Sequence, residues 1–130
     1  MGKVVHFEIP TDDLDRAKTY YQKVFGWELS TMEIPGGDDY TGATTTPVDE
    51  TMTPIEPGAI NGALVRRDEG NSAPVITIDV DDIDAALEQI AAAGGSTVTT
   101  RTAIPGMGAF AYFKDSEGNI TGLWETTPAG

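Results

Sequence analysis

The sequence predicts an α+β fold in which one module, a strand followed by a helix and three more strands (βαβββ), occurs twice in tandem. Two observations predict this doubling. A strand–helix segment near the start matches a second one after a shift of 69 residues, and two later segments match after a shift of 60. We therefore expect a single domain over residues 1–130, with module one at about 3–67 and module two at about 73–126.

The elements of module one follow from apolar spacing and turn residues. Residues 4–9 alternate as a strand that Pro10 and Thr11 should end. Apolar residues at helical spacing predict a helix that is capped by Asp12 or Asp13 and ends near Phe25. The rest of the module is expected to contain strands at 27–34, 40–46 and 60–66, a turn at 35–38 and a proline-rich loop at 47–58.

Module two repeats this order. Residues 75–80 are predicted to form a strand, and Asp81 and Asp82 to cap a helix that ends at Gly94 and Gly95. A strand at 97–101 follows, and a hairpin closes the chain. The hairpin consists of residues 110–114, a turn at 115–119 and a strand at 120–125.

The alternation of side chains along a strand assigns residues to opposite faces of each sheet. In the first strand, His6 and Glu8 share one face, and Val5, Phe7 and Ile9 share the other. In the first strand of module two, one face carries Val75, Thr77 and Asp79, and the other carries Ile76, Ile78 and Val80.

The repeat is supported by identities in a single register. A shift of 69 carries Ile9, Asp12, Asp13, Asp15, Ala17, Gly26 and Thr31 onto Ile78, Asp81, Asp82, Asp84, Ala86, Gly95 and Thr100. Any two strand–helix units share caps and apolar stripes, which is the alternative explanation. A second match, between GAINGALV at 58–65 and GNITGLWE at 118–125, is independent of the first and favours duplication.

Composition restricts the classes of function. The formal net charge is −13, from 21 acidic and 8 basic side chains spread along the chain, so we expect no binding to nucleic acid or to anionic membranes. Such a surface, with few lysines and many Asp and Thr residues, favours a halophilic protein of a high-salt cytoplasm, where salt screens the self-repulsion. An ordinary acidic protein is the alternative.

Two further absences in the sequence narrow the chemistry and the location. There are no cysteines, which excludes disulfides, thiolate metal sites and cysteine nucleophiles. No apolar run resembles a signal peptide or a membrane span, so we expect a cytoplasmic location.

The doubled plan resembles the vicinal oxygen chelate superfamily, which includes glyoxalase I, bleomycin-resistance proteins and ring-cleaving dioxygenases. The pieces that carry the resemblance are VVHFEI, DDLDRAKTYYQKVFGW, VITIDVDDIDAALEQIAAAGG and FKDSEGNITGLWE, so it covers essentially the whole chain. It implies that each module curls its mixed sheet into a half-barrel and that two modules enclose a cleft. It also implies a homodimer that binds a small-molecule ligand.

The resemblance also implies where a metal would bind. Metal enzymes of the superfamily take one ligand from the first and last strand of each module, positions that map onto His6, Val65, Val75 and Glu125. Only His6 and Glu125 could ligate a divalent ion such as Mn, Ni, Zn or Fe, so the metal set is incomplete. Polar groups on the same strand faces could supplement it, namely Glu8, Thr77 and Asp79.

Without a metal, His6 and Glu125 are candidates for catalysis, because a carboxylate bonded to an imidazole suits general base work or the anchoring of a polar ligand. The alternative is a buried pair without a function in catalysis. Aromatic residues could line a cleft for a flat ligand, or belong to the core; they are Trp27, Tyr40, Phe110 and Tyr112.

Three functions remain open at this point. The first is a small-molecule-binding member of the superfamily with an incomplete metal set. The second is a metal-dependent lyase, isomerase or dioxygenase of the glyoxalase type. The third is a non-catalytic dimeric interaction domain. The valines at positions 65 and 75 separate the first two.

Overall fold

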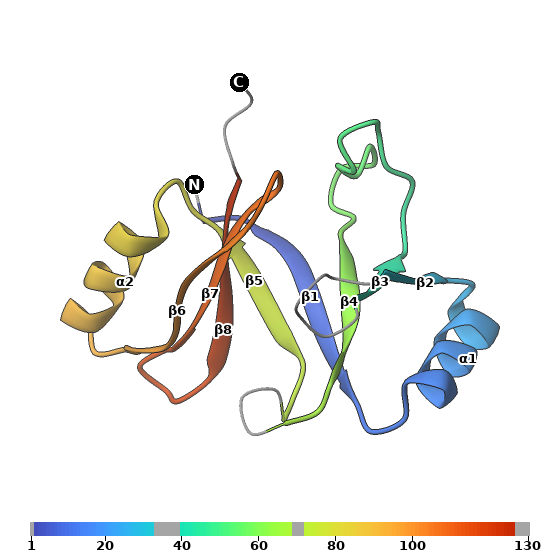
Figure 1. The fold of residues 1–130 in the computed structure, drawn as a ribbon, viewed down its shortest axis with the longest axis horizontal. Coiled ribbons are helices and arrows are strands. Elements are labelled where there is room, and N and C mark those ends of the chain that lie inside the picture. Colours follow the sequence, from blue (N-terminus) through green and yellow to red (C-terminus); the bar gives the residue numbers. More distant parts are fainter. Residues whose placement is uncertain (1, 33–39, 69–71, 127–130) are drawn as a thin grey trace. The chain divides into compact units, whose positions relative to one another are not determined.

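The computed structural model describes residues 2–32, 40–68 and 72–126, and these form two compact units. One unit, residues 6–74, is called module one below; the other, residues 1–5 with 75–130, is called module two. The elements, shown in Figure 1, are β1 (Val4–Thr11), α1 (Leu14–Phe25), β2 (Glu28–Met32), β3 (Tyr40–Thr44), β4 (Asn61–Arg66), β5 (Val75–Asp79), α2 (Ile83–Ala92), β6 (Ser96–Ile104), β7 (Gly108–Lys114) and β8 (Ile120–Thr126).

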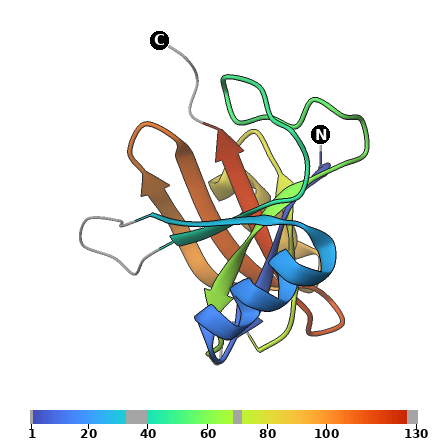
Figure 2. The same ribbon diagram turned by 90° about the vertical axis from the view of Figure 1, so that its right-hand side faces the viewer.

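In module one the strands are ordered β2-β3-β4-β1. β1 runs parallel to β4, whereas β3 is antiparallel to both β4 and β2, so the sheet is mixed. Helix α1 begins where Asp13 accepts a hydrogen bond from the backbone N–H of Arg16 at 3.0 Å, and it ends at Gly26 in the left-handed conformation. Figure 2 shows α1 across one face of this sheet.

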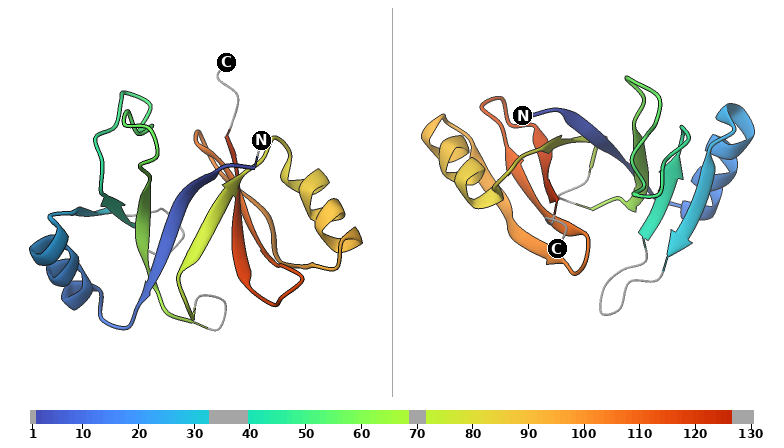
Figure 3. Two further views of the ribbon diagram at one scale, coloured as in Figure 1. Left: turned by 180° about the vertical axis from the view of Figure 1, so that it is seen from behind. Right: turned by 90° about the horizontal axis from the view of Figure 1, so that it is seen from above.

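Module two has the same plan, with the order β5-β8-β7-β6. β5 is parallel to β8, and β7 is antiparallel to β8 and β6. Helix α2 lies on one side of these strands, as Figure 3 shows, and its first residue, Ile83, is fully buried. The core beneath it consists of Ile83, Ala109, Ala111, Phe113 and Leu123.

The mixed α+β fold of two βαβββ modules is therefore confirmed. Both helices fall where the sequence predicts them, with Asp13 and Asp82 as the caps. No helix in the described part of the chain is long and apolar enough to cross a membrane. The predicted turn at 35–38 lies outside the described residues.

Several element boundaries differ from the sequence prediction, among them those of β1, β2 and β6. β1 continues through Pro10 to Thr11, because Thr11 is held on both sides: its hydroxyl donates to the Val65 carbonyl at 3.1 Å, and its own carbonyl accepts from the Arg67 N–H at 2.9 Å. A proline near a strand end costs the ladder little. β6 is longer than expected and is irregular near Thr99, while β2 begins at Glu28, after Trp27.

The strand ladders correct one predicted register. Ile9 pairs with Leu64 in module one, and Ile78, 69 positions later, pairs with Leu123 in module two. The last strands of the modules are therefore related by a shift of 59, not 60. Val65 corresponds to Trp124, and Arg66 to Glu125. The glycines that suggested 60 lie partly in the preceding turns, where no ladder fixes their position.

Each sheet has one face that its own helix covers and one that it does not; the second is called the helix-free face. In module one, Phe7 is on the helix side, because its ring is 5.6 Å from Trp27, which stacks on Tyr21 of α1. His6 and Glu8 therefore lie on the helix-free face. In module two Ile78 and Val80 pack against the core under α2, so that Val75 and Thr77 lie on the helix-free face.

Candidate functional site

The helix-free face of module one brings together ionisable side chains from two strands. Glu8 of β1, Ala63 of β4 and Gly42 of β3 form one row across the sheet, because Ala63 is in register with both others. Tyr40 lies two residues before Gly42 and so shares this face.

The charge of Glu8 affects the pKa of Tyr40. Glu8 is only 8% exposed, which is unusual for a carboxylate. Burial, and secondly the negative charge of Glu8, raise the pKa of Tyr40 to about 12. The phenol of Tyr40 therefore remains protonated at neutral pH and is available as a hydrogen-bond donor beside a buried carboxylate.

His6 lies on the same face, one row away, in register with Asn61. Burial lowers the pKa of His6, so the imidazole is neutral at neutral pH and can accept as well as donate a hydrogen bond. The Asn61 side chain accepts from the backbone N–H groups of Thr45 and Thr46, at 2.7 and 3.0 Å. These bonds attach the segment after β3 to the strand beside His6.

The other predicted site residues of module one divide between the two faces. Val65 lies on the helix-free face, two residues beyond Ala63. Trp27 does not: its ring stacks on Tyr21 at 4.7 Å with an interplanar angle of 9°, and it contacts Phe7. Trp27 is thus part of the packing under α1, which is the alternative that the sequence left open.

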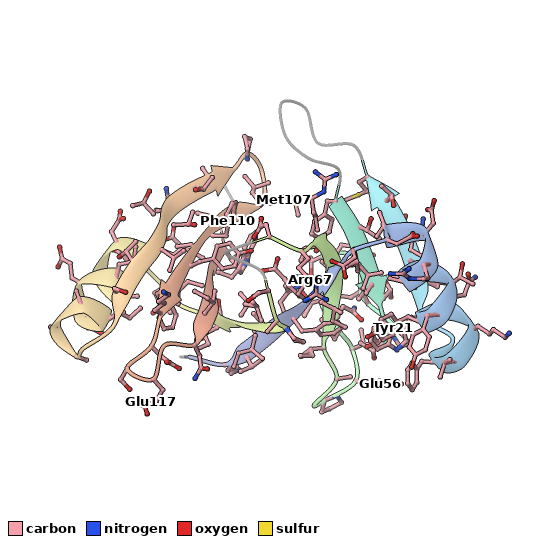
Figure 4. All side chains as sticks on the ribbon, turned by 90° about the horizontal axis from the view of Figure 1, so that it is seen from below. Tyr21, Glu56, Arg67, Met107, Phe110 and Glu117 are labelled. Atoms are coloured by element: carbon pink, nitrogen blue, oxygen red, sulfur yellow. The ribbon has the colours of Figure 1, made fainter. Side chains whose placement is uncertain are left out.

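In module two the helix-free face is mainly apolar and aromatic. Val75 and Thr77 are buried, and Thr77 is in register with Gly122, where an added Cβ would be 2.8 Å from the Thr77 hydroxyl. Phe110, labelled in Figure 4, and Tyr112 meet edge to face with their centroids 5.9 Å apart. Asp79 and Trp124, which are in register with each other, also lie on the helix-free face of module two.

Trp124 was not among the predicted site residues. The shift of 60 aligned it with Leu64, whereas the ladders align it with Val65. Its indole N–H donates to the Thr126 hydroxyl at 3.1 Å. A shift of 59 between the last strands, in place of 60, would have aligned Trp124 with Val65 and so assigned it to the helix-free face.

Glu125 has a clear structural role within module two. Its carboxylate accepts from the Ile83 N–H at 2.8 Å, at the start of α2, and from the Arg101 guanidinium at 2.7 Å. It therefore lies on the helix side of the sheet, opposite Val75 and Thr77. The catalytic and metal roles of Glu125 with His6 stay a prediction, one that these contacts do not favour.

The donor set does not fit a divalent metal held by three protein ligands. No group of three or more His, Asp or Glu side chains suited to an ion occurs among the residues that the structure describes, and the sequence has no cysteine. Among the described residues assigned to the helix-free face of module one, only His6 and Glu8 offer donor atoms of this kind. A divalent site normally needs more protein ligands and further groups that orient them.

The capping role of Glu125 predicts a pH-dependent stability. The Arg101 hydrogen bonds, followed by the Ile83 N–H, lower the pKa of Glu125 below its ordinary value of 4.5. A lowered pKa stabilises the fold above the ordinary value, and this contribution is lost as the pH falls through the folded-state pKa. The unfolding free energy of Glu125→Gln should therefore lie below that of the wild type at neutral pH and approach it in acid. Urea titrations across this range would measure the difference; one that does not change with pH contradicts the role.

The pairing of Tyr40 with Glu8 predicts an optical titration. The tyrosinate absorbance of the wild-type protein should contain a component that ionises near pH 12, and Tyr40→Phe should reduce that component by one tyrosine. In Glu8→Gln the same component should move to lower pH, because the charge that opposes ionisation is gone. Tyr20→Phe, at an exposed tyrosine of α1, is the control and should leave the component in place. No change in Glu8→Gln would show that the two groups are not coupled.

Comparison with known proteins places this architecture in a family. Residues 3–123 match the family described as the glyoxalase/bleomycin resistance protein/dioxygenase superfamily. A probable lactoylglutathione lyase of Vibrio parahaemolyticus is 30% identical over 131 residues, which cover 98% of this chain and 94% of that protein. The putative glyoxylase CFP32 of Mycobacterium tuberculosis is 33% identical over 129 residues; the match covers 98% of this chain but only 45% of that longer protein.

Solved structures agree on the fold. Methylmalonyl-CoA epimerase from Mycobacterium tuberculosis superposes with a TM-score of 0.65 at 22% identity, over 98% of this chain and 89% of that one. A variant of the Streptomyces coelicolor methylmalonyl-CoA epimerase gives 0.69 at 18% identity, over 98% and 99% of the two chains. With the family match over nearly its whole length, the chain belongs to the glyoxalase/bleomycin resistance protein/dioxygenase superfamily, the vicinal oxygen chelate proteins.

Proposed function

We propose that this protein binds a small organic molecule on the helix-free face of module one, without a complete set of metal ligands. The observation that carries the proposal is the buried carboxylate of Glu8 beside the protonated phenol of Tyr40, on the face that also holds His6. Burying a carboxylate is costly, and charged groups kept in such positions are often functional.

These groups can do more than bind. A buried carboxylate is suited to take a proton from a carbon next to a carbonyl group, and a neighbouring phenol can donate a hydrogen bond to the carbonyl oxygen as charge develops there. Glu8 would be the base, Tyr40 the donor and neutral His6 a second polar contact. Isomerases and epimerases use this step, and the names of the structural neighbours include an epimerase.

The second candidate is a metal-dependent lyase or isomerase. It is favoured by the Vibrio relatives, which are described as probable lactoylglutathione lyases. The donor set argues against it, since Val65 and Val75 stand where ligands would be needed and Glu125 is engaged by Ile83 and Arg101. A bound divalent ion would polarise substrate oxygens, and His6 and Glu8 are the residues of module one that could hold it.

Metal titration separates these candidates. We expect calorimetric titration of Mn²⁺, Ni²⁺ and Zn²⁺ into chelator-stripped protein at high salt to show no saturable binding at one ion per chain. A weak binding heat that does not differ between the wild type and His6→Ala would also support the metal-free proposal, because an acidic surface attracts cations without a defined site.

Tight binding at one ion per chain, lost in both His6→Ala and Glu8→Gln but kept in Glu125→Gln, would overturn the metal-free proposal. Assays for glyoxalase and dioxygenase activity would then follow. Tight binding that is lost in Glu125→Gln would instead restore the role first predicted for that residue.

We also propose that the protein is a homodimer of a high-salt cytoplasm. Helix α1 supports self-association, because it has no fully buried residue and exposes more than half of the side chains of Tyr20, Val24 and Phe25. The charge of −13 supports the high-salt environment. Sedimentation at low and high KCl should show a dimer that salt strengthens. A monomer at every salt concentration would contradict the dimer.

A further inference from the structure

A groove of about 290 Å³ lies on module one away from the helix-free face, between α1 and the end of β1. Its apolar wall consists of Ile9, Pro10 and Ala17, with the rings of Tyr20 and Tyr21 meeting edge to face at 5.1 Å. Its polar wall consists of Thr11, Asp12, Asp13, Arg16 and Arg67. Figure 4 labels two of the residues that line the groove, Tyr21 and Arg67.

The two arginines in the groove differ in what they contact. Arg67 is fixed: its Nε donates to the Asp12 carboxylate at 3.0 Å and its Nη1 donates to the Ser72 carbonyl at 2.6 Å. These bonds use two of the five N–H groups of a guanidinium. Arg16, by contrast, has no ion pair or side-chain hydrogen bond within the described ranges.

The carboxylates that line the groove bond to groups other than the Arg16 guanidinium. Asp12 pairs with Arg67, and Asp13 accepts from the backbone N–H of Arg16 as the cap of α1, at 3.0 Å. Arg16 is also the third residue of the helix, where the helix dipole disfavours a cation. An anion in the groove would relieve this unfavourable placement.

Module two shows what occupies the corresponding position there. Glu125 accepts from the first N–H of α2 and pairs with Arg101. Its counterpart in module one by the strand ladders is Arg66, so the last strand of module one supplies no carboxylate to the start of α1. The groove with the uncommitted Arg16 lies at this end of module one.

We propose that this groove binds a small organic carboxylate with an apolar body. The carboxylate would pair with Arg16 and the free N–H groups of Arg67, and the body would lie on Tyr20, Ile9 and Pro10. A guanidinium group can bind a carboxylate through two parallel hydrogen bonds. Because the Arg16 guanidinium has no other partner among the described residues, the ligand would not have to displace one. The site is separate from the ligand face of Glu8 and Tyr40, and it does not depend on the function proposed for that face.

Benzoate is the probe for this site, with neutral benzamide as its matched partner. In two-dimensional NMR titrations of the whole protein, benzoate should shift the amide signals of the residues that line the groove, saturably. Benzamide should bind about tenfold more weakly, because it lacks the charge that Arg16 would pair.

Two arginine variants test the location with equal changes in net charge. Arg16→Gln should weaken benzoate about tenfold. Arg66 is an exposed arginine at the same end of the sheet, and it does not line the groove. Arg66→Gln should therefore change the Kd of benzoate by no more than about twofold, because solvent and salt screen a charge that does not touch the ligand. Glu8→Gln should leave benzoate binding unchanged, which separates this site from the proposed ligand face.

Three results would overturn the proposal. They are the absence of saturable shifts in the wild type, equal Kd values for wild type and Arg16→Gln, and shifts centred on Glu8 and Tyr40 in place of the groove. In the last case benzoate would be a ligand of the helix-free face, and the function proposed for that face would gain support. Failure at the groove alone would leave that function untouched.

Discussion

The parallel pairing of the first strand with the last strand is the constraint on which each module depends. It sets which residues of β1 and β5 face the helix and which face away, because a parallel ladder fixes the register of every residue along both strands. The helix that follows the first strand must pack on one face only. His6 and Glu8 take their register from the β1–β4 ladder, and Thr77 takes its register from the β5–β8 ladder.

The same constraint determined how well the site could be predicted. The alternation in β1 correctly placed His6 and Glu8 on one face of that strand, and the alternation in β5 correctly placed Thr77 with Val75. A period of two residues is a property of the strand itself. Strand ends and hairpin register are set by partners across the sheet, which the sequence does not display. An error of one residue in the last strand moves a side chain to the opposite face. The sequence match pairs Glu125 with Val65, whereas the ladders pair it with Arg66, on the face where Glu125 contacts the start of α2.

Both helices were predictable for a different reason. Their caps and apolar stripes are local signals, and Asp13 and Asp82 each accept the hydrogen bond that the pattern predicts. The length of β1 was not predictable, since Thr11 is held in the strand by Val65 and Arg67, more than fifty positions away. The groove at Arg16 could not be predicted from the sequence either, because no local sequence motif indicates whether an arginine has a partner in the folded protein.

The ladders also show how the two modules have diverged. Where module one has His6 and Glu8, module two has Val75 and Thr77 at the equivalent positions. Where module two has Glu125, which stabilises the start of α2, module one has Arg66. Module two thus uses its Glu125 carboxylate to hold its own helix and presents a mainly apolar helix-free face, whereas module one keeps His6 and Glu8 on its helix-free face. A duplicated fold can divide its work in this way because each ladder keeps the geometry while the side chains change.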